Sequence, residues 1–230
     1  VLRKYRVLAL SDEIYSGTHF TGEHVSLARF YPEGTIISNG LSKWCGAGGW
    51  RLGFFVFPQS LSWLADAMAA VASETFTSTS APIQYAAVTA LEDRPEMESY
   101  MLHSRQILAA LAGHAHRTLT EAGATLSQPT GGFYLFPRFE AHRPGLAARG
   151  IDSGQGFCQA LLDETGVAAL PGDCFGRPHR ELSTRLAIVD FDGAQALQKA
   201  QSETVDEDFV RRHCNNVTTA VEQLADWANN

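Results

Sequence analysis

Several features that mark particular classes of protein are scarce or missing in this sequence. Its four cysteines are scattered and lack the close spacing of a metal site, so we expect reduced thiols in a cytoplasmic protein. Lys and Arg together number 18 against 25 Asp and Glu, and the resulting net charge of −7 argues against nucleic-acid binding. No transmembrane run, signal peptide, lipidation motif or internal repeat is visible, so we expect no membrane attachment.

The chain is nevertheless large and apolar enough to fold around a packed core. Its 230 residues suffice for one large domain or two small ones, and 45% of them are hydrophobic. His114 and His116 form a His-x-His pair on a predicted helix, but residues two positions apart do not share a helix face. We therefore expect these two histidines at the surface, and we expect no metal site.

The most informative stretch is residues 38–53, which place one lysine among small residues and five glycines. Apolar residues lead into it at 35–37 and out of it at 52–57, a pattern that predicts strand, loop and strand with Lys43 in the loop. A lysine among small and apolar neighbours can be partly desolvated, which favours its neutral, nucleophilic form. Arg51 follows eight residues later and is suited to a bidentate grip on a phosphate.

This stretch carries a resemblance to a known family. The run Gly40-Leu41-Ser42-Lys43, then two residues, Gly46-Ala47, and then Gly49-Trp50-Arg51-Leu52-Gly53 resembles the lysine-attachment signature of class I/II aminotransferases. These are pyridoxal 5'-phosphate (PLP) enzymes of fold type I. The resemblance implies an α/β fold, with the C-terminal part of a large, mostly parallel-sheet domain followed by a smaller α+β domain. We expect residues 1–95 in the PLP-binding large domain, and the long linking helix and small domain in residues 96–230.

A second motif, Ser11-Asp12-Glu13-Ile14-Tyr15, ends an apolar run at residues 7–10. In the family this strand end carries an aspartate that faces the pyridine nitrogen and a tyrosine that reaches the ring 3-oxygen. The resemblance implies these roles for Asp12 and Tyr15. A carboxylate there keeps the ring nitrogen protonated, so that the ring can accept electrons from a carbanion. Taken alone, Asp12 would be read as a strand-end cap.

A third motif, Pro171-Gly172-Asp173-Cys174-Phe175-Gly176, precedes an apolar run that begins at Thr184. It resembles a family turn that is followed by an arginine opening a strand, and it implies that Arg185 binds the α-carboxylate of an amino-acid substrate. The alternative is a surface arginine. By the same resemblance Arg51 holds the phosphate and Ser42 is a candidate phosphate contact. Gly40 stands where family members often have a hydroxyl group.

The resemblance implies an aminotransferase that moves an amino group between an amino acid and a 2-oxo acid through a Schiff base on Lys43. Lys43 would act as general base and acid, with PLP as the cofactor and a homodimer as the native form. Two alternatives remain open: a related PLP enzyme such as a carbon–sulfur lyase, and the aminotransferase-like sensor domain of a transcription regulator. No segment matches the family's N-terminal part, so we expect a truncated piece with an unpaired apolar sheet edge.

Hydrophobic periodicity and turn residues predict the remaining elements. We expect Trp50 and Tyr134 to pack in the core, although either could line a pocket. We expect strands at 6–11, 35–41, 52–57, 124–128, 132–139, 167–170 and from 184; helices at 25–30, from 60, at 83–91 with Ser80 as N-cap, and at 96–122, 156–164 and 207–228; and a mobile loop at 140–154.

Overall fold

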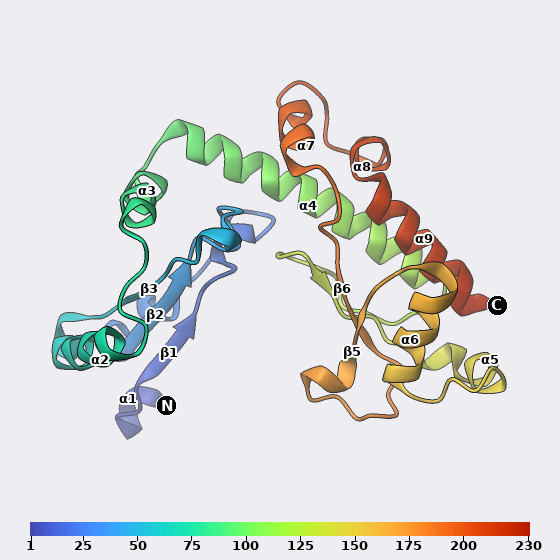
Figure 1. Cartoon of the computed structure of the whole chain (residues 1–230), viewed down its shortest axis with the longest axis horizontal. Helices are drawn as coiled ribbons and strands as arrows, with labels where there is room; N and C mark the ends of the chain where they lie inside the picture. The colour runs from blue at the N-terminus through green and yellow to red at the C-terminus, as the bar shows by residue number, and fades with distance from the viewer. The chain divides into compact units, whose positions relative to one another are not determined.

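The computed structural model describes all 230 residues, which form two compact units, Val1–Leu102 and His103–Asn230 (Figure 1). The long helix α4 (Pro95–Glu121) contributes residues to both units and confirms the helix predicted at 96–122. The expected division into domains at residues 95 and 96 remains a prediction. None of the helices has the length and apolar character needed to cross a membrane.

The first unit is built on a three-stranded sheet in the order β1-β2-β3. The strands are β1 (Ala9–Asp12), β2 (Thr35–Gly40) and β3 (Gly53–Val56). β1 runs parallel to β2, and β3 runs antiparallel to it, so the predicted strand, loop and strand around Lys43 are confirmed. The first strand starts later than predicted because the preceding residues form a short helix, α1 (Leu2–Tyr5), which Arg6 ends in a left-handed conformation at φ 53°.

Two helices of the first unit, α2 (Ser62–Thr75) and α3 (Ala81–Leu91), leave most of their apolar side chains exposed. Ser80 precedes α3 as predicted, although its hydroxyl makes no capping hydrogen bond. α2 buries none of its residues, and Tyr85 of α3 is 79% exposed. β1 is an edge strand, and its Leu10 is 65% exposed, in agreement with the predicted apolar edge.

The second unit contains a small antiparallel sheet in the order β4-β6-β5. The strands are β4 (Tyr134–Leu135), β6 (Thr184–Ala187) and β5 (Leu170–Pro171). The extended segments predicted at 124–128 and 132–139 meet only in part, through an isolated bridge between Thr125 and Arg138. Of these short strands, β5 packs against helix α6.

Five further helices complete the second unit: α5 (Arg143–Ala148), α6 (Gly154–Thr165), α7 (Gly193–Ala200), α8 (Glu207–His213) and α9 (Asn215–Asn229). The loop predicted at 140–154 is wrong, because α5 begins at Arg143 within it, with Pro144 in its first turn. The single helix predicted at 207–228 is also wrong, because Cys214 adopts a non-helical conformation at φ −128° and separates α8 from α9. α7 was not predicted; the Asp192 side chain caps it by accepting from the Gln195 N–H.

The core of the second unit joins α4, α6 and α9, and Figure 1 shows α9 beside the C-terminal part of α4. The ring of Phe157 is fully buried; it stacks on Phe139 at 4.7 Å and meets Trp227 edge-on at 5.1 Å. The expectation of a surface position for His114 is wrong. Its ring is buried, and Nδ1 lies 3.1 Å from Oε1 of Glu207, so a carboxylate from α8 replaces water as its partner.

Candidate active site

The loop that carries Lys43 closes on itself between β2 and β3. Gly40 and Gly53 are paired across the two strands, and the Leu41 N–H donates to the Leu52 carbonyl at 3.1 Å. Within the loop, the Ala47 N–H donates to the Leu41 carbonyl at 3.1 Å. Leu41, Ala47 and Leu52 are buried together in one hydrophobic cluster. Lys43 therefore projects from a packed turn and not from a free loop.

The structure brings Lys43 and Tyr15 together. The Nζ atom of Lys43 lies 5.7 Å from the centroid of the Tyr15 ring, within the range of a cation–π contact. Tyr15 follows β1, whereas Lys43 follows β2, so two neighbouring parallel strands deliver these side chains to the same edge of the sheet. Ligands of open α/β sheets bind at this carboxyl edge.

Asp12 is the last residue of β1 and is exposed at the same edge, beside Ser38 of β2. Its Oδ1 accepts a hydrogen bond from the Ile14 N–H at 3.3 Å. This contact is the strand-end cap that was the alternative interpretation of Asp12. Because the second carboxylate oxygen has no such partner, Asp12 can cap the strand and still offer an oxygen to a ligand.

The neighbouring Glu13 was missed by the sequence analysis. It is 7% exposed and accepts hydrogen bonds from the hydroxyls of Ser26 at 2.7 Å and Ser11 at 3.0 Å, and its Oε2 lies 2.9 Å from Nε2 of His24. Burial by itself raises the pKa of Glu13, but the hydrogen bonds together hold that pKa below its ordinary value. Glu13 therefore ties the segment around His24 and Ser26 to the strand end that carries Asp12 and Tyr15.

Arg51 ends the Lys43 loop in a left-handed conformation, at φ 56° and ψ 47°. Its guanidinium donates to the Gly48 carbonyl at 2.8 Å, and the side chain is exposed. The adjacent Trp50 is 51% exposed, so the expectation that it packs in the core is wrong. The structure thus places a cation on the outer turn of the loop, where an anion can reach it.

Gly40 and Ser42 lie at the start of the same loop. A Cβ atom at position 40 would approach the Leu52 carbonyl oxygen to 2.7 Å and the Gly53 Cα to 3.1 Å, so the close pairing of β2 and β3 leaves no room for one. The hydroxyl that family members often carry at this position therefore has no place in this arrangement. Ser42 is half-buried and is the hydroxyl of the loop nearest in sequence to Lys43.

A cavity of about 320 Å³ adjoins the loop within the first unit. Trp44, the residue after Lys43, lines it together with Asn39 of β2 and Ser16. Gly17 is needed beside Trp44, because a Cβ there would lie 2.6 Å from the Trp44 Cβ. Trp44 is thereby held against the strand ends, which restricts the backbone of its neighbour Lys43.

Arg185 lies in β6 of the second unit, between two aromatic rings. Its guanidinium carbon is 4.3 Å from the centroid of Tyr134 on β4 and 4.3 Å from that of Phe175. Phe175 belongs to the predicted Pro-Gly-x-x-Phe-Gly turn, which Gly176 ends at φ 79°. No carboxylate of the chain is paired with Arg185, so its N–H groups remain available to an anion. Tyr134 thus packs on Arg185 and is half-buried, in place of the expected core position.

Comparison with known proteins identifies the family. The model of the family described as "Aminotransferase class I and II" matches residues 1–197. The chain belongs to this family. An aspartate aminotransferase of Geobacillus stearothermophilus is 36% identical over 177 residues, which make up 75% of this chain and 43% of the relative. An asparagine–oxo-acid transaminase of Streptococcus mutans is 31% identical over 185 residues, 76% of this chain and 44% of the relative.

Solved aminotransferases share the fold as well. An aromatic aminotransferase from Pyrococcus horikoshii superimposes with a TM-score of 0.76 at 25% identity, over 98% of this chain and 52% of that chain. A double mutant of the Thermus thermophilus aspartate aminotransferase gives 0.71 at 27% identity, over 86% and 48% of the two chains. The predicted α/β aminotransferase fold is confirmed. The chain spans about half the length of the aminotransferases that it matches.

Proposed function

We propose that this chain is the PLP-binding and substrate-binding part of an aminotransferase, which transfers an amino group between an amino acid and a 2-oxo acid. The observation that carries the proposal is the approach of Lys43 to Tyr15 at the carboxyl edge of the sheet, in a chain of this family. The relatives described above are named as aminotransferases of aspartate, asparagine and aromatic amino acids. We infer an amino acid and a 2-oxo acid as substrates.

The residues at the sheet edge suit PLP chemically. They offer a primary amine on Lys43, a phenol on Tyr15 and a carboxylate on Asp12, with the Arg51 guanidinium and the Ser42 hydroxyl for the phosphate. When bound, PLP supplies a reactive carbonyl carbon and a ring that accepts electrons from the substrate α-carbon. We propose Lys43, Asp12, Tyr15, Arg51 and Ser42 as the cofactor-binding residues.

Each side chain then has one task. Lys43 Nζ acts as the general base that accepts the proton from the substrate α-carbon. In the reverse reaction it acts as the general acid that returns the proton to that carbon. Asp12 would pair its negative charge with the protonated ring nitrogen of bound PLP, and Tyr15 would donate a hydrogen bond to the ring 3-oxygen. Arg185, whose guanidinium lies between two rings, is pre-organised for a bidentate hydrogen bond with the substrate α-carboxylate.

We also propose a cytoplasmic homodimer. The four cysteines are all free thiols, which fits a reducing compartment. The exposed apolar side chains of α2 and α3, among them Trp63 at 63% and Val88 at 59% exposure, form the kind of surface that marks protein–protein contacts. Sedimentation of the purified chain at increasing concentration tests this association, and a monomer at all concentrations would contradict it.

Cofactor attachment is tested by incubating the chain with PLP, reducing with borohydride and mapping the modified peptides. The sequence contains three lysines, Lys4, Lys43 and Lys199, so the other two serve as internal controls. We expect a visible absorbance band and a label on Lys43 that Lys43→Arg abolishes and Lys199→Arg leaves in place. Equal labelling of all three lysines would contradict the proposed site. Amino-group transfer is then assayed with a panel of amino acids and 2-oxo acids.

A further inference from the structure

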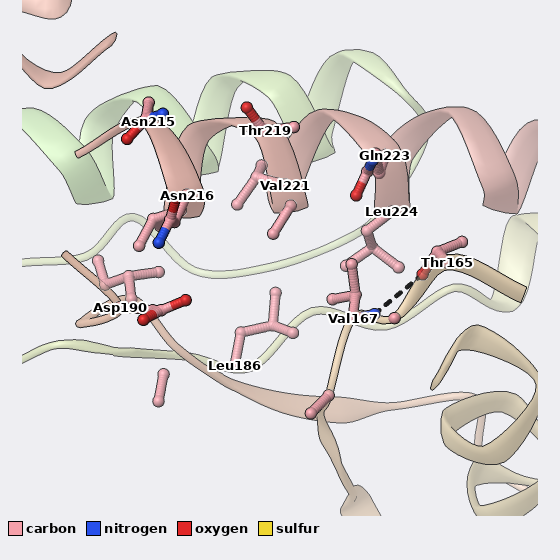
Figure 2. Close-up of a pocket in the computed structure, with 16 residues that line it drawn as sticks. Thr165, Val167, Leu186, Asp190, Asn215, Asn216, Thr219, Val221, Gln223 and Leu224 are labelled. Atoms are coloured by element: carbon pink, nitrogen blue, oxygen red, sulfur yellow. Dashed lines mark hydrogen bonds between the residues drawn. The ribbon is translucent and has the colours of Figure 1, made fainter. Parts of the chain in front are cut away.

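Figure 2 shows a cavity of about 650 Å³ in the second unit, between α9 and the end of β6. Its apolar walls, such as Leu186 and Leu224, are at most 6% exposed, and Asp190 and Asn216, which also line it, are exposed to solvent. The cavity therefore offers a ligand little accessible apolar surface. The first unit contains a group that is both charged and buried, the carboxylate of Glu13.

Glu13 lies in the chain between two of the proposed cofactor-binding residues, Asp12 and Tyr15. Because successive side chains of an extended strand alternate between its two faces, Asp12 is exposed at the sheet edge while Glu13 is 7% exposed. The Glu13 N–H donates to the Ser38 carbonyl of β2, and its carbonyl accepts from the Ser16 N–H, both at 2.9 Å. The backbone of Glu13 therefore joins the sheet to the turn that carries Tyr15.

Both oxygens of the Glu13 carboxylate are hydrogen-bonded. Oε1 accepts from the hydroxyls of Ser11 at 3.0 Å and Ser26 at 2.7 Å, and Oε2 lies 2.9 Å from Nε2 of His24. An ionised carboxylate only accepts hydrogen bonds, so Nε2 of His24 carries a proton. Ser26 in turn caps the short helical turn that follows it, by accepting from the Ala28 N–H at 3.1 Å. Three donors from two separate segments thus hold one buried charge.

A displacement of Glu13 would move two proposed cofactor-binding groups at once. Asp12 is its neighbour, and Tyr15 follows two residues later in a turn that is closed at both ends. The Tyr15 carbonyl accepts from the N–H of Thr18 at 3.0 Å and from its hydroxyl at 2.8 Å. The 5.7 Å between Lys43 Nζ and the Tyr15 ring centroid depends on this turn. Functional groups have to be held to within about 0.5 Å of their working geometry.

We propose that Glu13 is a positioning residue of the PLP site: its buried, ionised carboxylate fixes the turn that sets the distances among Asp12, Tyr15 and Lys43. Glu13 itself contacts neither cofactor nor substrate. Its role in the site rests on the proposed function, whereas the distance between Tyr15 and Lys43 is a property of the chain without PLP and can be measured on its own.

Four variants separate the carboxylate from its surroundings. Glu13→Gln keeps the size of the side chain but places N–H groups where an oxygen now accepts. Glu23→Gln is the matched control, because it removes the same charge from an exposed residue next to His24. His24→Ala removes one donor at an exposed position and keeps the proposal testable if Glu13→Gln does not fold. His24→Gln returns an N–H donor to that position.

The first measurement is the nuclear Overhauser effect (NOE) between the Lys43 side chain and the Tyr15 ring in the chain without PLP. The NOE falls steeply with distance, so we expect it to drop by about half in Glu13→Gln and His24→Ala, for a displacement of about 0.5 Å. It should stay unchanged in Glu23→Gln and recover in His24→Gln.

The second measurement is the pH midpoint of the visible absorbance band of the PLP-loaded chain. The charge of Asp12 and the hydrogen bond from Tyr15 act on the bound ring, so the midpoint should move by about 0.5 unit or more in Glu13→Gln and His24→Ala. Glu23→Gln should leave it in place. A purely structural loss of stability would lower the midpoint of urea unfolding without moving this pH midpoint.

An unchanged NOE in both Glu13→Gln and His24→Ala would overturn the proposal, and so would a pH midpoint that stays in place while the NOE drops. An equal effect of Glu23→Gln would overturn it as well, because net charge and not position would then be the cause. Failure of the unsubstituted chain to bind PLP would contradict the proposed function instead, and the NOE would still decide whether Glu13 sets the distance between Tyr15 and Lys43.

Discussion

The stacking of Arg185 between Tyr134 and Phe175 leads to a quantitative prediction for the second unit. The guanidinium carbon lies 4.3 Å from each ring centroid, and the side chain is half-buried. A cation–π contact is worth about 0.5–1 kcal/mol at exposed sites and about 2 kcal/mol when desolvated. The two contacts together should contribute about 1–2 kcal/mol to the free energy of unfolding. Arg185→Met removes the charge and the planar group and should cost this amount.

A double-mutant cycle with Phe175→Leu separates the stacking from other effects of losing the arginine. Phe175 is 40% exposed, so its replacement by leucine leaves little buried volume empty. We expect a coupling energy of about 0.5–1 kcal/mol between the two positions. The assay is urea unfolding of the full chain, followed through amide NMR signals of β4 and β6, which report on the second unit alone.

The control is Arg180→Met, in the exposed segment before β6, where the arginine side chain contacts no aromatic ring. A surface substitution of this kind should change the free energy of unfolding by less than about 0.5 kcal/mol. A coupling energy between Arg185 and Phe175 below about 0.3 kcal/mol, the limit of ordinary additivity, would refute the reasoning. Arg185 would then owe its orientation to Tyr134 and to the backbone of β6, without a contribution from Phe175.

Three further predictions concern single ionisable groups. Hydrogen bonds hold the pKa of Glu13 below its ordinary value, so its ionised carboxylate stabilises the folded state above the unfolded pKa of about 4.3. This contribution is lost as the pH falls through the folded pKa. Glu13→Gln should therefore make the free energy of unfolding, measured by urea titration, less dependent on pH in the acid range. Burial raises the pKa of the Cys214 thiol to about 11, so iodoacetamide at mildly alkaline pH should alkylate exposed Cys174 first, and equal rates by mass spectrometry would contradict this. Lys43→Ala should remove the PLP absorbance band without changing the far-ultraviolet circular dichroism, and loss of both signals would show that the lysine is needed for folding.

The sequence predicts the site-bearing part of the first unit well because local signals are strong there. Apolar runs bounded by glycine and proline predict β2 and β3 to within about two residues of their observed ends. The loop between them is closed by the hydrogen bond from the Leu41 N–H to the Leu52 carbonyl, and this closure restricts the position of Lys43. That Asp12, Tyr15 and Lys43 share one sheet edge follows from the parallel pairing of β1 with β2.

Other features depend on tertiary contacts that no local pattern carries. From the sequence, a carboxylate next to Asp12 would be expected at the surface. Glu13 is instead buried, because His24 and two serines surround it. His114 is buried because Glu207, 93 residues later, supplies its partner. The stacking of Arg185 on Tyr134 requires the pairing of β4 with β6, two strands that are 50 residues apart.

The left-handed backbone of Arg51 has a consequence for engineering this protein. A non-glycine residue in this conformation costs about 1–2 kcal/mol, a cost that glycine avoids. Laboratory evolution for thermal tolerance alone would therefore favour Arg51→Gly, which removes the cation proposed to hold the phosphate. Selection for heat resistance should favour glycine at position 51, whereas selection for cofactor affinity should favour arginine. A library screened for both properties should retain the arginine.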